Sequence, residues 1–462
     1  MLSLQDLIAS AGGEVIVRAR EEFSGVSIDS RTISGDELFF ALRGERHDGH
    51  SYLRDVLQKG GGAVIARGCD LSSLPHLPAN KTVVAVDDPL TALQAWARAL
   101  RFRFPHEVIG VVGSNGKTTT KELIASVLAV RFAAHKTAGN MNNHIGLPLS
   151  LLRKPDAAQI MIMEMGTNRP GDIRELCEIA GPSIGVVTNI GMEHLAGFGS
   201  LERVREAELE ILPYVHTAIV NADDRFLMDG VKSSFHGKIL SFAIDNRDAD
   251  IRASRIEPTA SGTRFVVHLG PESATVDLQL CGRFNVANAL AAVAAGSAAG
   301  MMLQEIRSGL ESFAGVHMRF SVVRHEGITI LSDVYNANPS SMDAAVDELV
   351  RRCREESGSG RCRMVAVLGN MLELGEREAE LHANLGRRLK AEGVEVFIGV
   401  GSLMRHAVEA FGPHAEAVED APAAARMLMP RLRPGDCLLV KGSRGMRMER
   451  FCEELGIEAG KK

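Results

Sequence analysis

The chain has 462 residues, of which 52 are Lys or Arg and 58 are Asp or Glu, giving a formal net charge of -6. One hydrophobic core does not usually serve a chain of this length, so we expect roughly two to four domains. The acidic balance argues against a nucleic-acid-binding protein, because such proteins usually carry a basic surplus.

The N-terminal segment and the cysteines predict the compartment. Residues 1–15 contain neither a basic n-region nor a long apolar stretch, so we expect no signal peptide, and no apolar run approaches membrane-spanning length. The seven cysteines include no C-x-x-C pair, and an odd, scattered set is typical of reduced, buried thiols in a reducing compartment. We therefore expect a cytoplasmic protein without membrane insertion. Separately, we expect it to be a monomer.

The first region, residues 1–105, mixes short strands and helices. ELFFAL (37–42) predicts a strand, and PLTALQAWARALRFRF (89–104) has the periodicity of a helix. This helix leads into Pro105, which we take as a domain boundary.

The second region, residues 106–315, alternates apolar runs with helical patterns, which is typical of a mostly parallel sheet covered by helices. The runs are VIGVVG (108–113), IMIMEMG (160–166), IGVVTNIG (184–191) and TAIVNADD (217–224). Between 238 and 281, the short alternating strands ILSFAI, RFVVHL and TVDLQL predict an antiparallel insertion. An alanine-rich helix is expected at 285–300.

The third region, residues 316–462, is a second α/β series. Its strand candidates are GITILSDV (327–334), RMVAVLGNM (363–371), VEVFIGVG (394–401) and CLLVKGS (437–443), and REESGSGRCR (354–363) predicts a surface loop. We therefore expect an α/β protein with a small mixed N-terminal domain (1–105), a central parallel-sheet P-loop domain (106–315) and a Rossmann-like C-terminal domain (316–462).

The stretch VIGVVGSNGKTTTKELIASVL (108–128) reads as a strand, a glycine loop and a helix, which is the context of a phosphate-binding loop. Gly113 and Gly116 let the backbone wrap an anion, Lys117 would reach the β- and γ-phosphates, and Thr118 would place a hydroxyl on magnesium. Val111 occupies the first glycine position of the strict G-x-x-x-x-G-K-[ST] pattern. The alternative is an ordinary strand–turn–helix.

Polar side chains follow two further strands of the expected parallel sheet. Glu164 ends one strand, Asn189 ends another, and His194 follows soon after. Because the carboxyl ends of parallel strands meet at one edge, all three should lie beside Lys117. A carboxylate within an apolar run is costly unless it is paired or bound to metal, so Glu164 is the sharper signal. His194 could equally be a loop histidine with satisfied hydrogen bonds.

An ordered set of motifs resembles the ATP-dependent Mur ligase family of peptidoglycan synthesis, across nearly the whole chain. These motifs are GSNGKTTTKE, GNMNNHIGLPLSLL, EMGTNRPGDI, TNIGMEHLAGFGS, GRFNVANALAA, SDVYNANPSSMDAA and VLGNMLELGE. YNANPSSM and ELGE, with DSR and FFALRGER near the N-terminus, resemble the branch that adds D-alanyl-D-alanine to UDP-N-acetylmuramoyl-tripeptide.

The resemblance implies an activity and its partners. ATP would phosphorylate the terminal carboxylate of the UDP-linked tripeptide, and the amine of D-alanyl-D-alanine would attack the acyl phosphate to give the pentapeptide, ADP and phosphate. ATP and a pair of Mg2+ ions are the implied cofactors, and nucleic acid is not a partner. The alternatives are a diaminopimelate- or lysine-adding ligase, a folylpolyglutamate synthase, a P-loop motor or switch, or a nucleotide-gated binding protein without turnover.

The resemblance also implies roles for individual residues. Lys117, Glu164, His194 and Glu208 would be catalytic, with Thr118, Glu164, His194 and Glu208 as metal ligands. The implied ATP contacts are Gly113, Ser114, Asn115, Gly116, Lys117, Thr118, Thr119, Asn285, Asn288, Arg319 and Asp333. The implied substrate contacts are Ser30, Arg31, Asn140, Asn142, Asn143, Asn336 and Asn338.

Several of these residues have ordinary alternatives. Asn285 could cap a helix, Arg31 could be a solvated side chain, and the asparagines at 140–143 and 336–338 could simply form loops and turns. Phe284 stands where the family often has a histidine before the first adenine-contacting asparagine.

Glu208 is a departure from the family pattern. Most members carry a lysine there, which reacts with carbon dioxide to give a carbamate that helps hold the second magnesium. A glutamate is already an anion of that kind, so the resemblance implies that Glu208 replaces the carbamate and that activity needs no bicarbonate. The alternative is a solvated charge on the helical segment ERVREAELEI.

Overall fold

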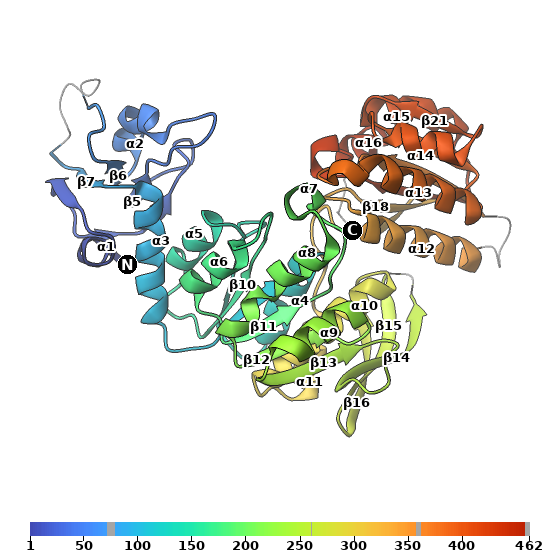
Figure 1. Cartoon of the computed structure of the whole chain (residues 1–462), viewed down its shortest axis with the longest axis horizontal. Helices are drawn as coiled ribbons and strands as arrows, with labels where there is room; N and C mark the ends of the chain where they lie inside the picture. The colour runs from blue at the N-terminus through green and yellow to red at the C-terminus, as the bar shows by residue number, and fades with distance from the viewer. Residues whose placement is uncertain (72–78, 260, 357–361, 458–462) are drawn as a thin grey trace.

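The computed structural model describes residues 1–71, 79–259, 261–356 and 362–457. Figure 1 shows three successive lobes, and each is built on one of the three larger sheets of the described chain: the N-terminal lobe in blue, the central lobe in green and yellow, and the C-terminal lobe in orange and red. The expected boundaries at 105 and 315 fall between these sheets and stay predictions.

The N-terminal lobe has a five-stranded sheet in the order β2-β7-β6-β5-β4, in which only β2 runs antiparallel to its neighbour. Its strands are β2 (Glu14–Val17), β4 (Gly25–Ser27), β5 (Glu37–Phe40), β6 (Gly62–Ala66) and β7 (Thr82–Val86), and a separate pair joins β1 (Leu2–Ser3) to β3 (Glu22–Phe23). Helices α1 (Leu4–Ala11) and α2 (Leu53–Lys59) complete it. The strand expected at 37–42 is confirmed by β5.

Helix α3 (Pro89–Phe102) confirms the helix expected before Pro105. It begins at an Asp88 cap, whose carboxylate accepts a hydrogen bond from the Thr91 N–H at 2.9 Å. Its buried face, centred on the fully buried Trp96, packs against α1 and against α5 (Gly146–Leu152) and α6 (Asp172–Ala180) of the central lobe. One helix thus ties the first two lobes together.

The central lobe has a nine-stranded sheet in the order β16-β15-β14-β13-β12-β11-β8-β10-β9. Strands β8 to β14 pair in parallel, whereas β14–β15 and β15–β16 pair antiparallel. The strands are β8 (Val108–Val112), β9 (Ala134–Lys136), β10 (Ile160–Glu164), β11 (Ile184–Val187), β12 (Thr217–Asn221), β13 (Lys238–Ala243), β14 (Ile251–Pro258), β15 (Thr263–Leu269) and β16 (Glu272–Leu278). The four expected apolar runs are confirmed as β8, β10, β11 and β12.

The prediction of an antiparallel insertion was wrong for the first of its three strands. ILSFAI forms β13, which pairs parallel with β12 and with β14. The alternation of apolar and polar residues suggested a half-exposed antiparallel strand, but helix α9 (Arg225–Ser234) intervenes after β12 and makes a crossover connection, which places β13 parallel. The antiparallel strands β14 to β16 extend the same sheet rather than forming a separate unit.

Two sets of helices cover the two faces of the central sheet. One face packs against α4 (Lys117–Leu128), α10 (Arg283–Ala298) and α11 (Leu303–Glu311). The other packs against α5, α6, α9 and the 3-10 helix η2 (Leu209–Tyr214), which continues α8 (Leu201–Glu208). The alanine-rich helix expected at 285–300 is confirmed as α10.

The C-terminal lobe has a six-stranded sheet in the order β17-β18-β22-β19-β20-β21, parallel except for β17. Its strands are β17 (Ser321–His325), β18 (Ile328–Asp333), β19 (Arg363–Gly369), β20 (Val396–Val400), β21 (Ala415–Val418) and β22 (Asp436–Lys441). Helices α12 (Pro339–Glu356), α13 (Glu378–Ala391) and α14 (Met404–Phe411) pack in one core, and α15 (Ala421–Leu428) and α16 (Glu449–Glu454) in another. All four strand candidates are confirmed.

The loop expected at 354–363 was partly wrong. Residues 354–356 are the last turn of α12 and Arg363 begins β19, while residues 357–361 lie outside the described chain.

The cysteine prediction was wrong for one pair. Cys353, near the end of α12, forms a disulfide with Cys362 before β19. The pairing depends on the end of a helix meeting the start of a strand, which sequence spacing does not reveal. Cys177, Cys281, Cys437 and Cys452 are buried free thiols as expected, whereas Cys69 is half-buried. Because two cysteines are paired, the cysteines no longer support the prediction of a reducing compartment.

Over the described ranges, no helix combines the length and the apolar character that crossing a bilayer requires.

Candidate active site

The phosphate loop lies between β8 and α4, as the sequence predicted. Gly113 has φ 117° and Gly116 has φ 83°, and both values favour glycine. A Cβ on Gly113 would lie 2.3 Å from Thr188 Oγ1, and one on Gly116 would lie 2.4 Å from Asn288 Oδ1. Close approach as well as conformation therefore requires glycine at both positions, and the strand–loop–helix context is confirmed.

The end of β11 holds the loop from the side. The Asn115 N–H donates to Asn189 Oδ1 at 3.1 Å, and Thr188 Oγ1 donates to the Asn115 carbonyl at 2.7 Å. The Gly191 N–H donates to Ser114 Oγ at 2.8 Å. Asn189 therefore lies at the expected sheet edge, where it fixes the backbone of the phosphate loop.

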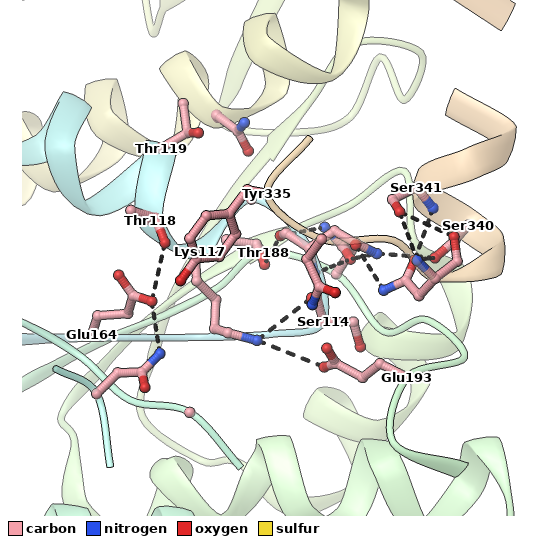
Figure 2. Close-up of a pocket in the computed structure, with 18 of the residues that line it drawn as sticks. Ser114, Lys117, Thr118, Thr119, Glu164, Thr188, Glu193, Tyr335, Ser340 and Ser341 are labelled. Carbon is pink, nitrogen blue, oxygen red and sulfur yellow. Dashed lines mark hydrogen bonds and ion pairs between the residues drawn. The ribbon is translucent and has the colours of Figure 1, made fainter. Parts of the chain in front are cut away.

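Lys117 is the cation of this loop (Figure 2). Its ammonium donates to the Gly113 carbonyl and lies 3.7 Å from Glu193 Oε1. Burial lowers the pKa of Lys117, but the carboxylates of Glu193, Glu208 and Glu164 outweigh burial and leave that pKa above its usual value. The ammonium is therefore charged and available to an anion.

Glu164 ends β10 and is almost fully buried, with 1% of its surface exposed. Its Oε1 accepts a hydrogen bond from Thr118 Oγ1 at 3.1 Å, as Figure 2 shows, and another from Asn142 Nδ2 at 2.9 Å. Its Oε2 has no hydrogen-bond partner, although Lys121 Nζ lies 3.5 Å away. A spare carboxylate oxygen beside a threonine hydroxyl has the donor chemistry that Mg2+ prefers.

Glu208 lies behind the phosphate loop rather than on the cavity wall. Its side chain is fully buried, and Oε2 accepts a hydrogen bond from the Gly113 N–H at 2.6 Å. Burial raises the pKa of Glu208, while Lys117 and the Gly113 N–H oppose that rise. The alternative of a solvated helix charge was wrong, and the metal-ligand role stays a prediction.

Glu193 is a site residue that sequence reasoning missed. Burial raises its pKa to about 8, although Lys117 acts in the opposite direction. Its Oε1 makes no hydrogen bond, so Lys117 is its charge partner. The available signal was an acidic residue directly before His194, in a segment that continues from a buried strand.

His194 lies at the expected edge but faces the C-terminal lobe. Its Nδ1 contacts the Glu373 carboxylate, and the nearby Ala196 N–H donates to the Glu373 carbonyl at 3.0 Å. Burial lowers the pKa of His194, and Glu373 partly offsets this. Across the described residues, no group of three or more His, Cys, Asp or Glu side chains is arranged to hold a metal ion. Joint ligation by Glu164, His194 and Glu208 stays a prediction.

A cavity of about 890 Å3 joins the central and C-terminal lobes at the phosphate loop. The sequence-predicted residues that line it are Ser114, Asn115, Gly116, Lys117, Thr118, Thr119, Asn140, Asn142, Asn143, Glu164, His194, Asn285, Asn288, Arg319, Asp333, Asn336 and Asn338. Glu193, Tyr335, Ser340 and Lys441 also line it and were not predicted. Sequence patterns from two lobes therefore converge on one cavity.

The C-terminal lobe contacts the phosphate loop directly. Asn338 Nδ2 donates to Asn115 Oδ1, and Asn115 Nδ2 donates to Ser340 Oγ, both at 2.9 Å. Asn338 Oδ1 also accepts from the Ser341 N–H at 2.9 Å, at the start of α12, so this asparagine both shapes the turn and bridges the lobes. Lys441, at the end of β22, forms a buried ion pair with Asp333.

The two predicted adenine contacts belong to α10. The N-cap of that helix is Gly282, so the alternative of Asn285 as the N-cap was wrong. Asn285 Nδ2 donates to the Cys281 carbonyl at 2.8 Å, and its Oδ1 accepts from Asn288 Nδ2 at 3.1 Å. Both side chains are buried and line the cavity.

Ser30 and Arg31 lie in the N-terminal lobe and are not brought to the cavity. The Arg31 side chain is 86% exposed and forms an ion pair with Asp29 at 2.6 Å. That hydrogen-bonded arginine holds the pKa of Asp29 at about 2. The uridine-diphosphate role of these residues stays a prediction.

Comparison with known proteins assigns the chain. Family models described as the Mur ligase catalytic domain, middle domain and glutamate ligase domain match residues 22–101, 111–296 and 318–444. The UDP-N-acetylmuramoyl-tripeptide--D-alanyl-D-alanine ligase of Bacillus subtilis is 35% identical over 439 residues, which cover 93% of each chain. The chain belongs to the Mur ligase family. It is therefore an ATP-dependent ligase, as the sequence motifs implied.

Solved structures agree with this assignment of the Mur ligase. A crystal structure of MurF from Acinetobacter baumannii has a TM-score of 0.87 and 30% identity, and covers 98% of both chains. The MurF ligase of Thermotoga maritima, solved in complex with ADP, has a TM-score of 0.81 and 29% identity, and covers 93% of this chain and 96% of that one. The expected α/β fold class is confirmed.

Proposed function

We propose that this Mur ligase uses ATP to join D-alanyl-D-alanine to UDP-N-acetylmuramoyl-tripeptide, releasing ADP and phosphate. The observation that carries the proposal is the shared cavity, in which Lys117 and Glu164 face residues from the C-terminal lobe. Support also comes from the activity for which the Bacillus subtilis relative is named, since that protein matches over nearly the whole length of both chains.

The reaction brings two polyanions together, and the residues of the phosphate loop meet that need. The N-terminus of α4 attracts phosphate, and the Lys117 ammonium offsets the charge that moves during transfer. The phosphoryl group passes from ATP to the tripeptide carboxylate, the D-alanyl-D-alanine amine attacks the acyl carbon, and phosphate leaves as the amide forms. The attacking nitrogen loses a proton in that step.

Magnesium belongs to this proposal, because Glu164 Oε2 accepts no hydrogen bond and has only the Lys121 ammonium at 3.5 Å as its ion-pair partner. The adjacent Thr118 hydroxyl oxygen accepts one hydrogen bond, from Arg319, and keeps a second lone pair, so both oxygens fit a hard cation. When bound there, the ion would polarise phosphate oxygens and neutralise their charge. His194 and Glu208 are the further ligands that the family resemblance implies. Glu208 Oε2 holds the Gly113 N–H, whereas Glu208 Oε1 has no hydrogen-bond partner and is the oxygen that would serve such an ion, directly or through a bridging water.

The lobes divide the binding of the substrates. Asn140, Asn142 and Asn143 lie on the cavity wall beside Glu164, where they would orient the tripeptide end, and Ser30 and Arg31 would hold the distant uridine diphosphate. Asn336 and Asn338 approach from the C-terminal lobe, which would carry the dipeptide, and Asp333 of the same lobe would contact ATP. Because an acyl phosphate hydrolyses in water, closure of that lobe would protect the intermediate.

The test is ADP release by the full chain with Mg2+, ATP and UDP-linked tripeptide, with and without D-alanyl-D-alanine, followed by mass measurement of the product. ADP release that requires the dipeptide, with a product heavier by one dipeptide less water, is expected. ADP release with diaminopimelate, lysine or glutamate, and not with D-alanyl-D-alanine, would show that the chain is a related ligase. Nucleotide binding with no release for any amine would indicate a binding protein. Cytoplasmic location and a monomeric state stay predictions.

A further inference from the structure

Tyr335 is a cavity residue to which neither the motifs nor the proposed reaction assigns a role. It follows β18 in the C-terminal lobe, and its ring contacts a cation from another segment: the Arg319 guanidinium carbon lies 3.8 Å from the ring centroid. Figure 2 shows the ring in the same part of the cavity as Lys117 and Thr118. This distance is well within the range of a cation–π contact.

The other side of Arg319 meets the phosphate-loop helix. Arg319 Nη2 donates a hydrogen bond to Thr118 Oγ1 at 2.8 Å, and Thr118 Oγ1 in turn donates to Glu164. The guanidinium therefore lies between the tyrosine ring and the hydroxyl next to Lys117. Both described contacts, a hydroxyl and a ring face, leave the positive charge of Arg319 uncancelled and available to phosphate oxygens.

The backbone around Arg319 is fixed more firmly than its side chain. Met318 has φ 60°, a left-handed conformation, and Phe320 is buried with its ring edge-on to Phe284 at a centroid distance of 5.0 Å. These neighbours determine where the Arg319 Cα lies. A long, half-exposed arginine side chain has many rotamers. Besides the hydrogen bond to Thr118, a second contact is therefore needed to fix the direction of the guanidinium, and the Tyr335 ring supplies it.

The ring itself is held by the C-terminal sheet. Lys441 Nζ forms an ion pair with Asp333 and donates to the Asn336 carbonyl at 2.8 Å, so the turn on both sides of Tyr335 is fastened to the end of β22. The position of the ring therefore follows the C-terminal lobe, whereas Thr118 belongs to the central lobe.

We propose that Tyr335 is a positioning residue for the ligation: its ring holds the Arg319 guanidinium against Thr118 and makes the direction of that charge depend on the position of the C-terminal lobe. The inference rests on the proposed function, since the aligned charge would act on the phosphoryl group in transfer. It assigns the effect to the face of the ring and gives the tyrosine hydroxyl no part.

The test compares Tyr335→Phe with Tyr335→Leu in the full chain by steady-state ADP release with ATP, tripeptide and D-alanyl-D-alanine. Tyr335→Phe keeps the ring and should stay within about threefold of the natural chain, whereas Tyr335→Leu should lower kcat about tenfold with little change in the KM for ATP. Tyr335→Met serves the same purpose if the leucine variant does not fold. The matched control is Tyr214→Leu, a half-buried tyrosine on η2 that donates to Glu178 at 3.3 Å.

A double-mutant cycle separates positioning from a general structural effect. In an Arg319→Ala background, Tyr335→Leu should cost no further activity. Equal rates for Tyr335→Phe and Tyr335→Leu would overturn this inference, and so would a loss of activity on Tyr335→Leu that is as large in the Arg319→Ala background as in the natural chain. Neither result would affect the proposed function. Absence of ADP release by the unmodified chain with every amine would instead overturn the proposed function.

Discussion

Replacing Glu208 with glutamine removes a negative charge from beneath the phosphate loop at constant volume. The carboxylate is fully buried and accepts the Gly113 N–H at 2.6 Å. A hydrogen bond to a charged acceptor contributes roughly 1.5–3 kcal/mol and a neutral one about 0.5–1.5 kcal/mol. The difference of about 1–1.5 kcal/mol corresponds to an approximately tenfold loss of kcat/KM.

The assay is ADP release at about pH 8.5, because burial raises the pKa of this carboxyl group and alkaline buffer favours the ionised form. The matched control is Glu206→Gln on the same helix, since Glu206 is exposed. Equal kcat/KM values for the two variants would refute the reasoning.

The same position offers a second comparison, which uses carbon dioxide. The natural chain should be indifferent to bicarbonate in degassed buffer, whereas Glu208→Lys, which introduces the residue of most family members, should regain activity only when bicarbonate is added. Stimulation of the natural chain by bicarbonate would show that the carboxylate does not replace a carbamate.

Three further outcomes are expected. Lys117→Met should lower kcat/KM by at least about a hundredfold, measured as ADP release, because the phosphate in transfer loses its cation. Gly113→Ala should destabilise the chain by roughly 2–5 kcal/mol and weaken ATP binding, since φ is 117° and the new Cβ would meet a side chain at 2.3 Å; Gly270→Ala, at φ 56° in open space, should cost less in thermal unfolding. Denatured, unreduced chain should expose five thiols to Ellman's reagent and seven after reduction, because Cys353 and Cys362 are paired; seven without reductant would contradict the disulfide.

The fold was predictable where a local pattern determines the structure. Buried parallel strands read as continuous apolar runs, so β8, β10, β11 and β12 could be placed from the sequence alone. The direction of β13 was missed because alternation reports exposure of the faces and not the direction of pairing, which the preceding helix decides. The disulfide was missed because it depends on where α12 ends.

The site was predictable where burying the residue is energetically costly or where the residue belongs to a recognised motif. Glu164 stood out as a charge inside a buried strand, and Lys117 stood out through its glycine loop. Glu193, Tyr335 and Lys441 act through neighbours that are distant in sequence, and no local spacing records that they meet. Such contacts are set by how the lobes face one another.

The side-chain amide of Asn115 fills the seam between the phosphate loop and α12 with hydrogen bonds in both directions. An inhibitor with one hydrogen-bond donor and one acceptor would bind between the two elements, replace Asn115 as the partner of Ser340 and Asn338, and hold the central and C-terminal lobes apart. Such a compound would resemble neither nucleotide nor peptide, but because Asn115 is an implied ATP contact it would compete with ATP. A pair of fluorophores, one on the central lobe and one on the C-terminal lobe, would measure the increase in the distance between the lobes directly.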